Sequence, residues 1–193
     1  KNGNLMSVDE VVGKVEFLRR KNRFAPKVVS ITGGEPLIHQ EFLRRLIPCL
    51  KKISLKVLLE TNGSVFPSET VKKILKQADF VSADIKMPSS IKMPASAIFK
   101  KHSEFLKSVP PQKLWIKIPI TSATNDKEFS RTMALVKKYT PQSVPIFIQP
   151  VSPPGSHDTS YIHLPSPQKV FILGYVAKKI LGHRRRIHIT PQM

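Results

Sequence analysis

The sequence predicts an α/β fold built around a mainly parallel sheet, and three observations carry that prediction. Helix-capping patterns and short apolar runs alternate along the 193 residues, an order typical of parallel strands joined by helices. Each apolar run has one apolar face and one face that becomes polar toward the end of the run. Two glycines and a carboxylate, Gly33-Gly34-Glu35, follow the first run directly.

Six helices are predicted, five of them from their start signals. Ser7 and Glu10 form a capping box at the first one, and Pro167 and Gly182 suit the first turn and the end of the last one. The expected helices cover residues 7–20, 39–52, 68–77, 96–107, 125–139 and 166–182, with Ser68, Ser96, Asn125 and Ser166 as further N-caps.

Between the helices fall six apolar runs that we interpret as strands, at residues 28–31, 55–59, 80–85, 114–118, 144–148 and 186–189. The proline-rich stretch 149–167 is the one irregular connection. It is too long for an ordinary loop between a strand and a helix, so we expect it to be an active-site loop.

The two faces of the predicted strands differ. One face is apolar throughout, with Val29, Ile31, Val57, Leu59, Val81, Ala83, Ile85, Leu114, Ile116, Ile118, Ile146, Ile148, Ile187 and Ile189. The other face ends in Glu60, Asp84, Lys86, Lys117 and Gln149. A sheet covered on both sides needs two apolar faces, so a barrel with outer helices and a polar mouth fits better. We expect the five polar residues to converge near Glu35, although each one alone also fits a solvated strand end.

The Gly33-Gly34-Glu35-Pro36 segment has two interpretations. It is either a tight turn between a strand and a helix, or a loop whose glycines let a ligand approach the backbone closely. The convergence of polar strand ends favours the binding loop.

The composition limits the function classes. The length fits one domain with its own core. No stretch approaches the roughly 18 apolar residues of a membrane span and no signal peptide is recognisable, so we expect a cytoplasmic protein without a membrane partner. Cys49 is the only cysteine, which excludes an internal disulfide or a multi-cysteine metal site built from these residues alone.

The charge is strongly positive, with 32 Lys and Arg against 13 Asp and Glu, a formal +19. Scattered basic residues mostly indicate solvated helix faces. A nucleic-acid partner and attraction of a small anionic substrate remain alternatives. The scarcity of aromatic residues among the basic ones argues against stacking on single strands.

The strand ends resemble a known family. Thr32-Gly33-Gly34-Glu35-Pro36-Leu37 is similar to the TGGEP segment of radical S-adenosylmethionine enzymes. The similarity continues in order through Glu60-Thr61-Asn62-Gly63, Asp84-Ile85-Lys86, Trp115-Ile116-Lys117, Ile148-Gln149-Pro150 and Pro191-Gln192-Met193. The branch it resembles most contains 7-carboxy-7-deazaguanine synthases and activases of glycyl-radical enzymes. The resemblance implies one core domain over residues 1–193, a partial (β/α)6 TIM-like barrel whose first strand is missing from this chain.

The resemblance also implies a cofactor and its site. Gly33, Gly34 and Glu35, with Pro36, would hold the methionine amino group of S-adenosylmethionine. Thr61, Asn62, Asp84 and Lys86 would lie near its ribose and carboxylate, and Lys117 and Gln149 would complete the rim toward cofactor or substrate. A [4Fe-4S] cluster, a small anionic substrate and an external electron donor are implied as well. Mg²⁺ and a homodimer are compatible with the family.

One feature departs from the family. Its members carry a CxxxCxxC loop after the first barrel strand, where three thiolates bind the cluster. No cysteine precedes Gly33, and Cys49 stands beside Pro48 in the following helix, where we expect a buried apolar role. We therefore expect the cluster-binding N-terminal segment and the extreme C-terminus to be absent from this chain. A homologue that has lost its cluster would also lack these cysteines, but this alternative does not explain why the first barrel strand is missing.

The function implied is that of a 7-carboxy-7-deazaguanine synthase, a lyase of deazapurine and queuosine biosynthesis that rearranges a carboxylated pterin by radical chemistry. Two alternatives stay open. One is the activating enzyme of a glycyl-radical enzyme, and the other is a non-catalytic basic binding module without the cluster. The sequence identifies no catalytic residue.

Overall fold

A computed structural model describes residues 5–22, 24, 26–88, 94–151 and 164–190. Six parallel strands form one sheet whose spatial order follows the chain, as predicted. The strands are β1 (Val28–Ile31), β2 (Lys56–Thr61), β3 (Phe80–Asp84), β4 (Leu114–Ile120), β5 (Ile146–Pro150) and β6 (Ile187–Ile189).

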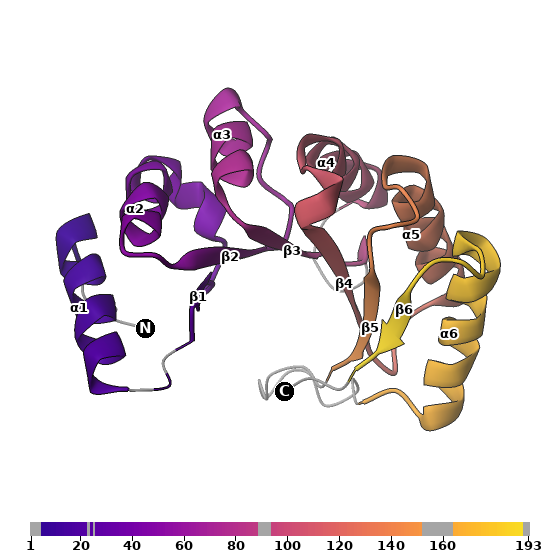
Figure 1. Cartoon of the computed structure of the whole chain (residues 1–193). Coiled ribbons are helices and arrows are strands. Elements are labelled where there is room, and N and C mark those ends of the chain that lie inside the picture. Colours follow the sequence, from indigo (N-terminus) through magenta and orange to yellow (C-terminus); the bar gives the residue numbers. More distant parts are fainter. Residues whose placement is uncertain (1–4, 23, 25, 89–93, 152–163, 191–193) are drawn as a thin grey trace.

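Six α-helices connect and cover these strands. They are α1 (Val8–Lys21), α2 (Gln40–Lys52), α3 (Glu69–Gln77), α4 (Ala95–Ser108), α5 (Asp126–Tyr139) and α6 (Pro167–Leu181), with 3-10 turns η1 (Pro36–His39) and η3 (Pro111–Lys113). The sheet is arched, the helices cover its outer side, and β1 and β6 form the two edges (Figure 1). The fold is an open, partial barrel, as the sequence predicted.

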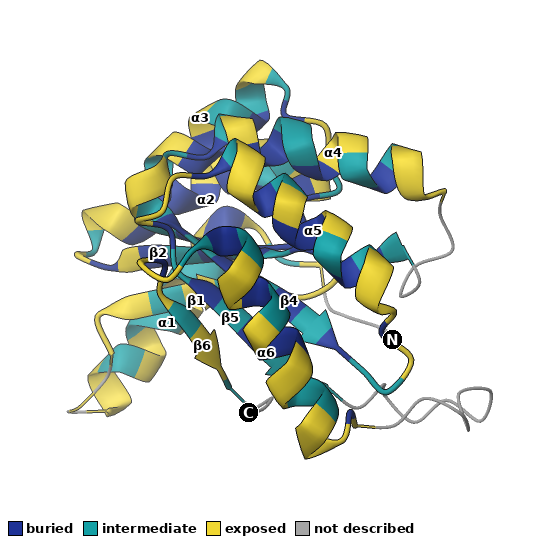
Figure 2. Ribbon diagram, turned by 90° about the vertical axis from the view of Figure 1, so that its right-hand side faces the viewer, coloured by how far each residue is buried: buried dark blue, intermediate teal, exposed yellow. Residues whose placement is uncertain are grey.

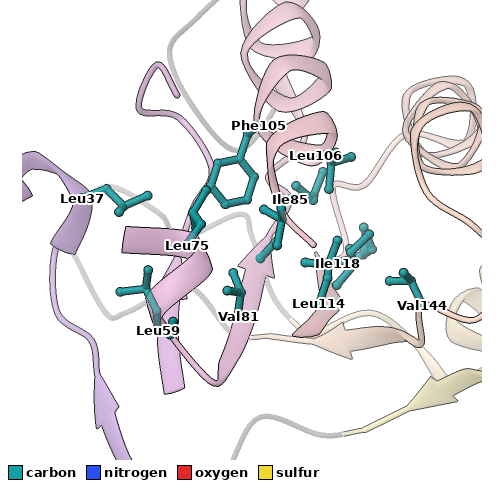
Figure 3. Packing of buried hydrophobic residues seen from close by; sticks show 14 of the residues in the cluster. Leu37, Leu59, Leu75, Val81, Ile85, Phe105, Leu106, Leu114, Ile118 and Val144 are labelled. Atoms are coloured by element: carbon teal, nitrogen blue, oxygen red, sulfur yellow. The ribbon is translucent and has the colours of Figure 1, made fainter. Parts of the chain in front are cut away.

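The core lies between the sheet and the helices, on the strand face predicted to be apolar. Val57, Leu59, Ile116 and Ile146 are fully buried. Figure 3 shows strand residues such as Leu59, Val81 and Ile118 packed near helix residues such as Leu75, Phe105 and Leu106. The helices have buried residues on one side and exposed residues on the other (Figure 2). Burial of this apolar surface is the main stabilising term of the fold.

The two edge strands bury less of the predicted face. Val29 and Ile31 in β1 are half-buried, and Ile189 in β6 is 48% exposed. Each edge strand has a strand neighbour on one side only, so fewer side chains pack against it.

Several element boundaries differ from the prediction. β2 extends to Thr61 because Glu60 and Thr61 continue the pairing with β3. The predicted cap at Ser96 is wrong, since α4 begins at Ala95 after Pro94 and no side chain caps it. The N-cap lies two residues earlier, at Pro94, whose fixed φ of −57° is compatible with the helix that follows.

Two of the predicted features lie outside the described part of the chain, and Cys49 lies within it. Most of the predicted active-site loop, residues 152–163, and the C-terminal motif 191–193 lie outside the described residues. Cys49 packs against the core from α2, as expected, but it is half-buried and not buried as predicted. No helix in the described ranges has the length and apolar character needed to cross a membrane.

Candidate functional site

The glycine loop after β1 combines a turn with an open surface. Gly33 and Gly34 have φ values of +97° and +53°, which side chains rarely tolerate. A Cβ atom built at either position meets no atom within 4 Å. The glycines are therefore required by backbone conformation, and their backbone faces open space that a ligand can enter.

Glu35 fastens this loop to the end of β2. Its Oε1 accepts hydrogen bonds from the Leu37 amide at 3.0 Å and the Thr61 hydroxyl at 2.8 Å. Its Oε2 accepts one from the Asn62 amide at 2.7 Å. The first of these bonds caps η1. A carboxylate has about four acceptor positions, so one remains for a ligand.

The turn after β2 is built to hold Glu35. Thr61 is only 3% exposed, and its hydroxyl also accepts from the Gly63 amide at 3.1 Å. Asn62 accepts from the Ser64 amide through its side chain. Gly63 has φ +62°, and an added Cβ would lie 3.0 Å from a Phe105 ring carbon. Thr61 therefore acts through Glu35, because its side chain is turned into the protein.

The end of β3 carries an ion pair and a buried histidine. Lys86 Nζ lies 2.9 Å from Asp84 Oδ2, with both side chains about one-third exposed. His102 of α4 is fully buried, and its Nε2 donates to the Lys86 carbonyl at 3.1 Å. Burial lowers the pKa of His102, and the hydrogen bond to the Lys86 carbonyl opposes this shift only in part. The ring supports the loops after β2 and β3 together.

His102 was not predicted, although the sequence contains a signal for it. It is the polar member of the buried stripe on α4, which also contains Ile98, Phe105 and Leu106. A histidine at such a position is more often a packed core residue than a ligand, and its partner lies 16 residues away.

A second ion pair lies on the inner face of the sheet. Glu60 accepts from Lys117 Nζ and from Ser30 Oγ, each at 2.7 Å. Burial raises the pKa of Glu60, but the hydrogen bonds from Lys117 and Ser30 outweigh it and leave the pKa below its usual value. Glu60 is therefore ionised at neutral pH and fixes the Lys117 ammonium.

Aromatic side chains flank this ion pair along the same face. The Phe147 and His188 rings are stacked, with centroids 4.9 Å apart. The Trp115 and Phe80 rings are tilted toward each other, with centroids 5.9 Å apart. Lys117 and Phe147 are register partners on β4 and β5. The inner face thus offers a fixed cation beside flat apolar surfaces, which suits a planar anionic ligand.

The polar strand ends form three separate hydrogen-bonded groups, and their convergence on Glu35 stays a prediction. Glu35 joins Thr61 and Asn62, Asp84 joins Lys86, and Glu60 joins Lys117. Gln149 lies farther along the sheet, opposite Pro119 in the register of β4 and β5.

The donor set fits part of the chemistry expected. The Glu35 carboxylate, the open glycine backbone and the Lys86 ammonium fit a zwitterionic amino-acid group. A cluster bound by three thiolates does not fit, because the sequence has one cysteine and it packs against the core. Within the described ranges, no three His, Cys, Asp or Glu side chains are grouped so that they could hold a metal ion.

Comparison with known proteins gives a consistent result. The Radical SAM superfamily model matches residues 1–136. A 7-carboxy-7-deazaguanine synthase of Geobacter sulfurreducens is 30% identical over 189 residues, which cover 98% of this chain and 70% of that protein. An indoleacetate decarboxylase activating enzyme of Tractidigestivibacter scatoligenes is 24% identical over 135 residues, covering 65% of this chain and 41% of that protein.

A solved structure matches the fold. A domain of pyruvate-formate lyase-activating enzyme from Bacteroides vulgatus superimposes with a TM-score of 0.62 at 18% identity, covering 84% of this chain and 98% of that domain. At this identity the likeness concerns the fold alone.

Proposed function

This chain belongs to the radical SAM superfamily, and from that premise we propose that it binds S-adenosylmethionine at the ends of β1, β2 and β3 and acts as a 7-carboxy-7-deazaguanine synthase. The observation that carries the proposal is similarity to such a synthase along 98% of the chain. The site adds chemical support, because its charged groups complement both the cofactor and a planar anionic pterin.

In this proposal Glu35 binds the methionine ammonium of S-adenosylmethionine. Three protein hydrogen bonds already orient its carboxylate, and the open backbone of Gly33 and Gly34 lets the amino group approach. Pro36 is buried at the start of η1 and fixes the chain direction after Glu35. An ammonium–carboxylate contact of this kind is a charge-assisted hydrogen bond.

The other residues of the site are assigned to groups of the cofactor by their charge and hydrogen-bonding capacity. Lys86 suits the methionine carboxylate, and Asp84 and Asn62 suit the ribose hydroxyls. Asp84 and Lys86 form an ion pair at 2.9 Å. When the cofactor binds, each side chain then forms a contact to the cofactor in place of part of its contact with the other. Thr61, being buried, keeps Glu35 in place and does not touch the ligand.

The substrate lies on the inner face in this proposal. Lys117, held by Glu60, binds the carboxylate of the pterin, and Gln149 hydrogen-bonds to the ring. S-adenosylmethionine supplies radical chemistry when it is bound, and the protein orients the reactants and excludes water. The chain holds only Cys49, so these 193 residues do not supply three thiolates for a cluster.

Binding of S-adenosylmethionine to the purified chain tests the site by calorimetry. The variant E35Q should weaken binding by about 1.5–3 kcal/mol, or about tenfold to 150-fold. The matched control is E41Q, because Glu41 is exposed and pairs with Arg44 on α2. An analogue without the amino group separates direct contact from collapse of the loop, because its binding should be nearly insensitive to E35Q. Equal binding by E35Q and E41Q refutes the proposal.

A second candidate function is supported by the similarity to an activating enzyme over 135 residues. The two functions differ in substrate. The protein, supplied with a carboxylated pterin, forms a deazaguanine product if it is a synthase. Formation of a glycyl radical on a partner enzyme, detected by electron paramagnetic resonance, supports the activating enzyme instead.

A further inference from the structure

The last third of the chain has an unusual charge distribution. Residues 129–193 include nine Lys and Arg side chains but one acidic residue, Asp158. Nothing in the proposed chemistry uses this excess, because the cofactor and substrate positions lie at the other end of the strands. The excess is therefore a property of a separate surface.

A buried arginine brings the two basic segments of this region together. Arg185 is 3% exposed, and its Nε donates to the Val144 carbonyl at 3.1 Å. Its Nη2 donates to the Thr140 hydroxyl at 2.6 Å. Burial lowers the pKa of Arg185 to about 10, so it stays protonated at neutral pH. These bonds lock the loop after α6 onto the loop after α5.

This arrangement presents six other basic residues to solvent. Because Arg185 turns inward, its neighbours Arg184 and Arg186 are exposed. The last turns of α5 and α6 end in exposed lysine pairs, and the two helices lie side by side (Figure 1). We call this set the basic patch: Lys137, Lys138, Lys178, Lys179, Arg184 and Arg186.

The surroundings of the basic patch are polar. Gln142, Ser143 and His183 are exposed between its members and offer hydrogen-bonding groups. The exposed apolar residues Phe171 and Ile172 belong to the first half of α6, and the exposed Tyr175 lies about one turn before Lys178. Helix C-termini favour lysines in any protein, but Arg184 and Arg186 lie beyond the helix.

We propose that the basic patch binds the phosphate backbone of a nucleic acid. Six cations spread over two helix ends and a loop exceed what one small anion needs, and they match a row of phosphates. A protein partner would favour an apolar, desolvated centre, and a lipid surface would favour inserted aromatic residues. No apolar residue is among the six members of the patch, and the exposed Tyr175 beside Lys178 and Lys179 carries a polar hydroxyl. The patch lies where the strands begin, so a nucleic acid bound there leaves the cofactor end open.

Fluorescence anisotropy with a labelled duplex of about 20 base pairs tests this proposal. The patch variant is K137Q/K138Q/R184Q/R186Q. The control variant K14Q/K52Q/K73Q/K101Q removes the same charge from exposed positions on α1 to α4. We expect about tenfold weaker binding or more for the patch variant, and a salt dependence shallower by about 3 in log–log slope. RNA and DNA duplexes of one sequence show whether the 2′-hydroxyl contributes.

Several outcomes would overturn the proposal. Equal weakening in both variants would mean that net charge alone attracts the duplex. Binding of wild type to phosphatidylserine vesicles but not to duplex would identify a membrane surface instead, and saturable binding to neither would exclude a polyanion site. Thermal unfolding confirms that both variants fold. S-adenosylmethionine binding should be unchanged in both, so failure here is distinguishable from failure of the proposed enzyme function.

Discussion

Replacing Thr61 by valine tests whether the end of β2 holds Glu35 in place. The change keeps the shape of the side chain and removes one hydroxyl. That hydroxyl donates to Glu35 Oε1 at 2.8 Å and accepts from the Gly63 amide at 3.1 Å. Because Thr61 is 3% exposed, water cannot easily replace either partner.

The expected cost follows from these two bonds. Loss of a hydrogen bond to a charged group costs about 1.5–3 kcal/mol, and an unsatisfied buried amide costs about 1–3 kcal/mol. Glu35 is partly accessible and recovers some solvation, so we expect T61V to lower the free energy of unfolding by about 3 kcal/mol. For a domain of this size that corresponds to a melting temperature lower by about 6–12 °C.

The matched control is T132V. Thr132 is also fully buried, but its hydroxyl donates to the Glu128 carbonyl one turn earlier in α5. We expect T132V to cost less than about 1 kcal/mol, because such a carbonyl keeps its helical partner. Urea unfolding of both variants gives the two free energies of unfolding. They can be compared if the free energy depends on urea concentration with the same slope in both variants.

Affinity for S-adenosylmethionine should fall in T61V and remain unchanged in T132V, measured well below both melting temperatures. Equal unfolding free energies for the two variants would refute the view that Thr61 fastens the Glu35 loop. Full stability with lost binding would instead mean that Thr61 touches the ligand itself.

Two further predictions concern the neighbouring loops. Burial lowers the pKa of His102 from 6.5, so the unfolded chain binds the proton more readily than the folded protein. The free energy of unfolding should therefore fall as the pH drops below 6.5. Urea midpoints measured between about pH 8 and pH 5 should show this fall, and it should be smaller in H102L. At Gly63, alanine adds a clash with Phe105 to a positive φ, whereas at Gly33 it adds strain alone, so G63A should destabilise by about 2–3 kcal/mol and G33A by about 1–2 kcal/mol in the same unfolding assay. Equal costs for the two alanine variants would contradict the packing seen at Gly63.

Local sequence signals predicted most of the fold because they act over a few residues. The capping box of Ser7 and Glu10 forms as predicted, and the strands alternate as expected. The predicted N-cap at Ser96 was wrong because α4 already begins after Pro94. Each of these outcomes depends on backbone conformation within one turn.

The site was predicted less completely because its contacts are distant in sequence. Glu60 and Lys117 are 57 residues apart and meet because β2 and β4 lie on either side of β3 in the sheet. Thr61 is different, since the alternation that placed Glu60 on the polar face already places Thr61 on the opposite, buried face. The family motif suggested a ligand contact there, whereas the alternation of the strand, carried on by two residues from Leu59, gives the buried position that the structure shows.

The hydrogen bonds to Glu35 bear on how the site selects its ligand. Three protein donors occupy most of the carboxylate, so its position and much of its desolvation are set before any ligand arrives. A site organised in this way loses little conformational entropy on binding. The single remaining acceptor position admits one strongly directed donor. An ammonium group satisfies it while gaining a charge-assisted contact, whereas a hydroxyl gains less, so the loop should discriminate between S-adenosylmethionine and its 2-hydroxy analogue even without a cluster.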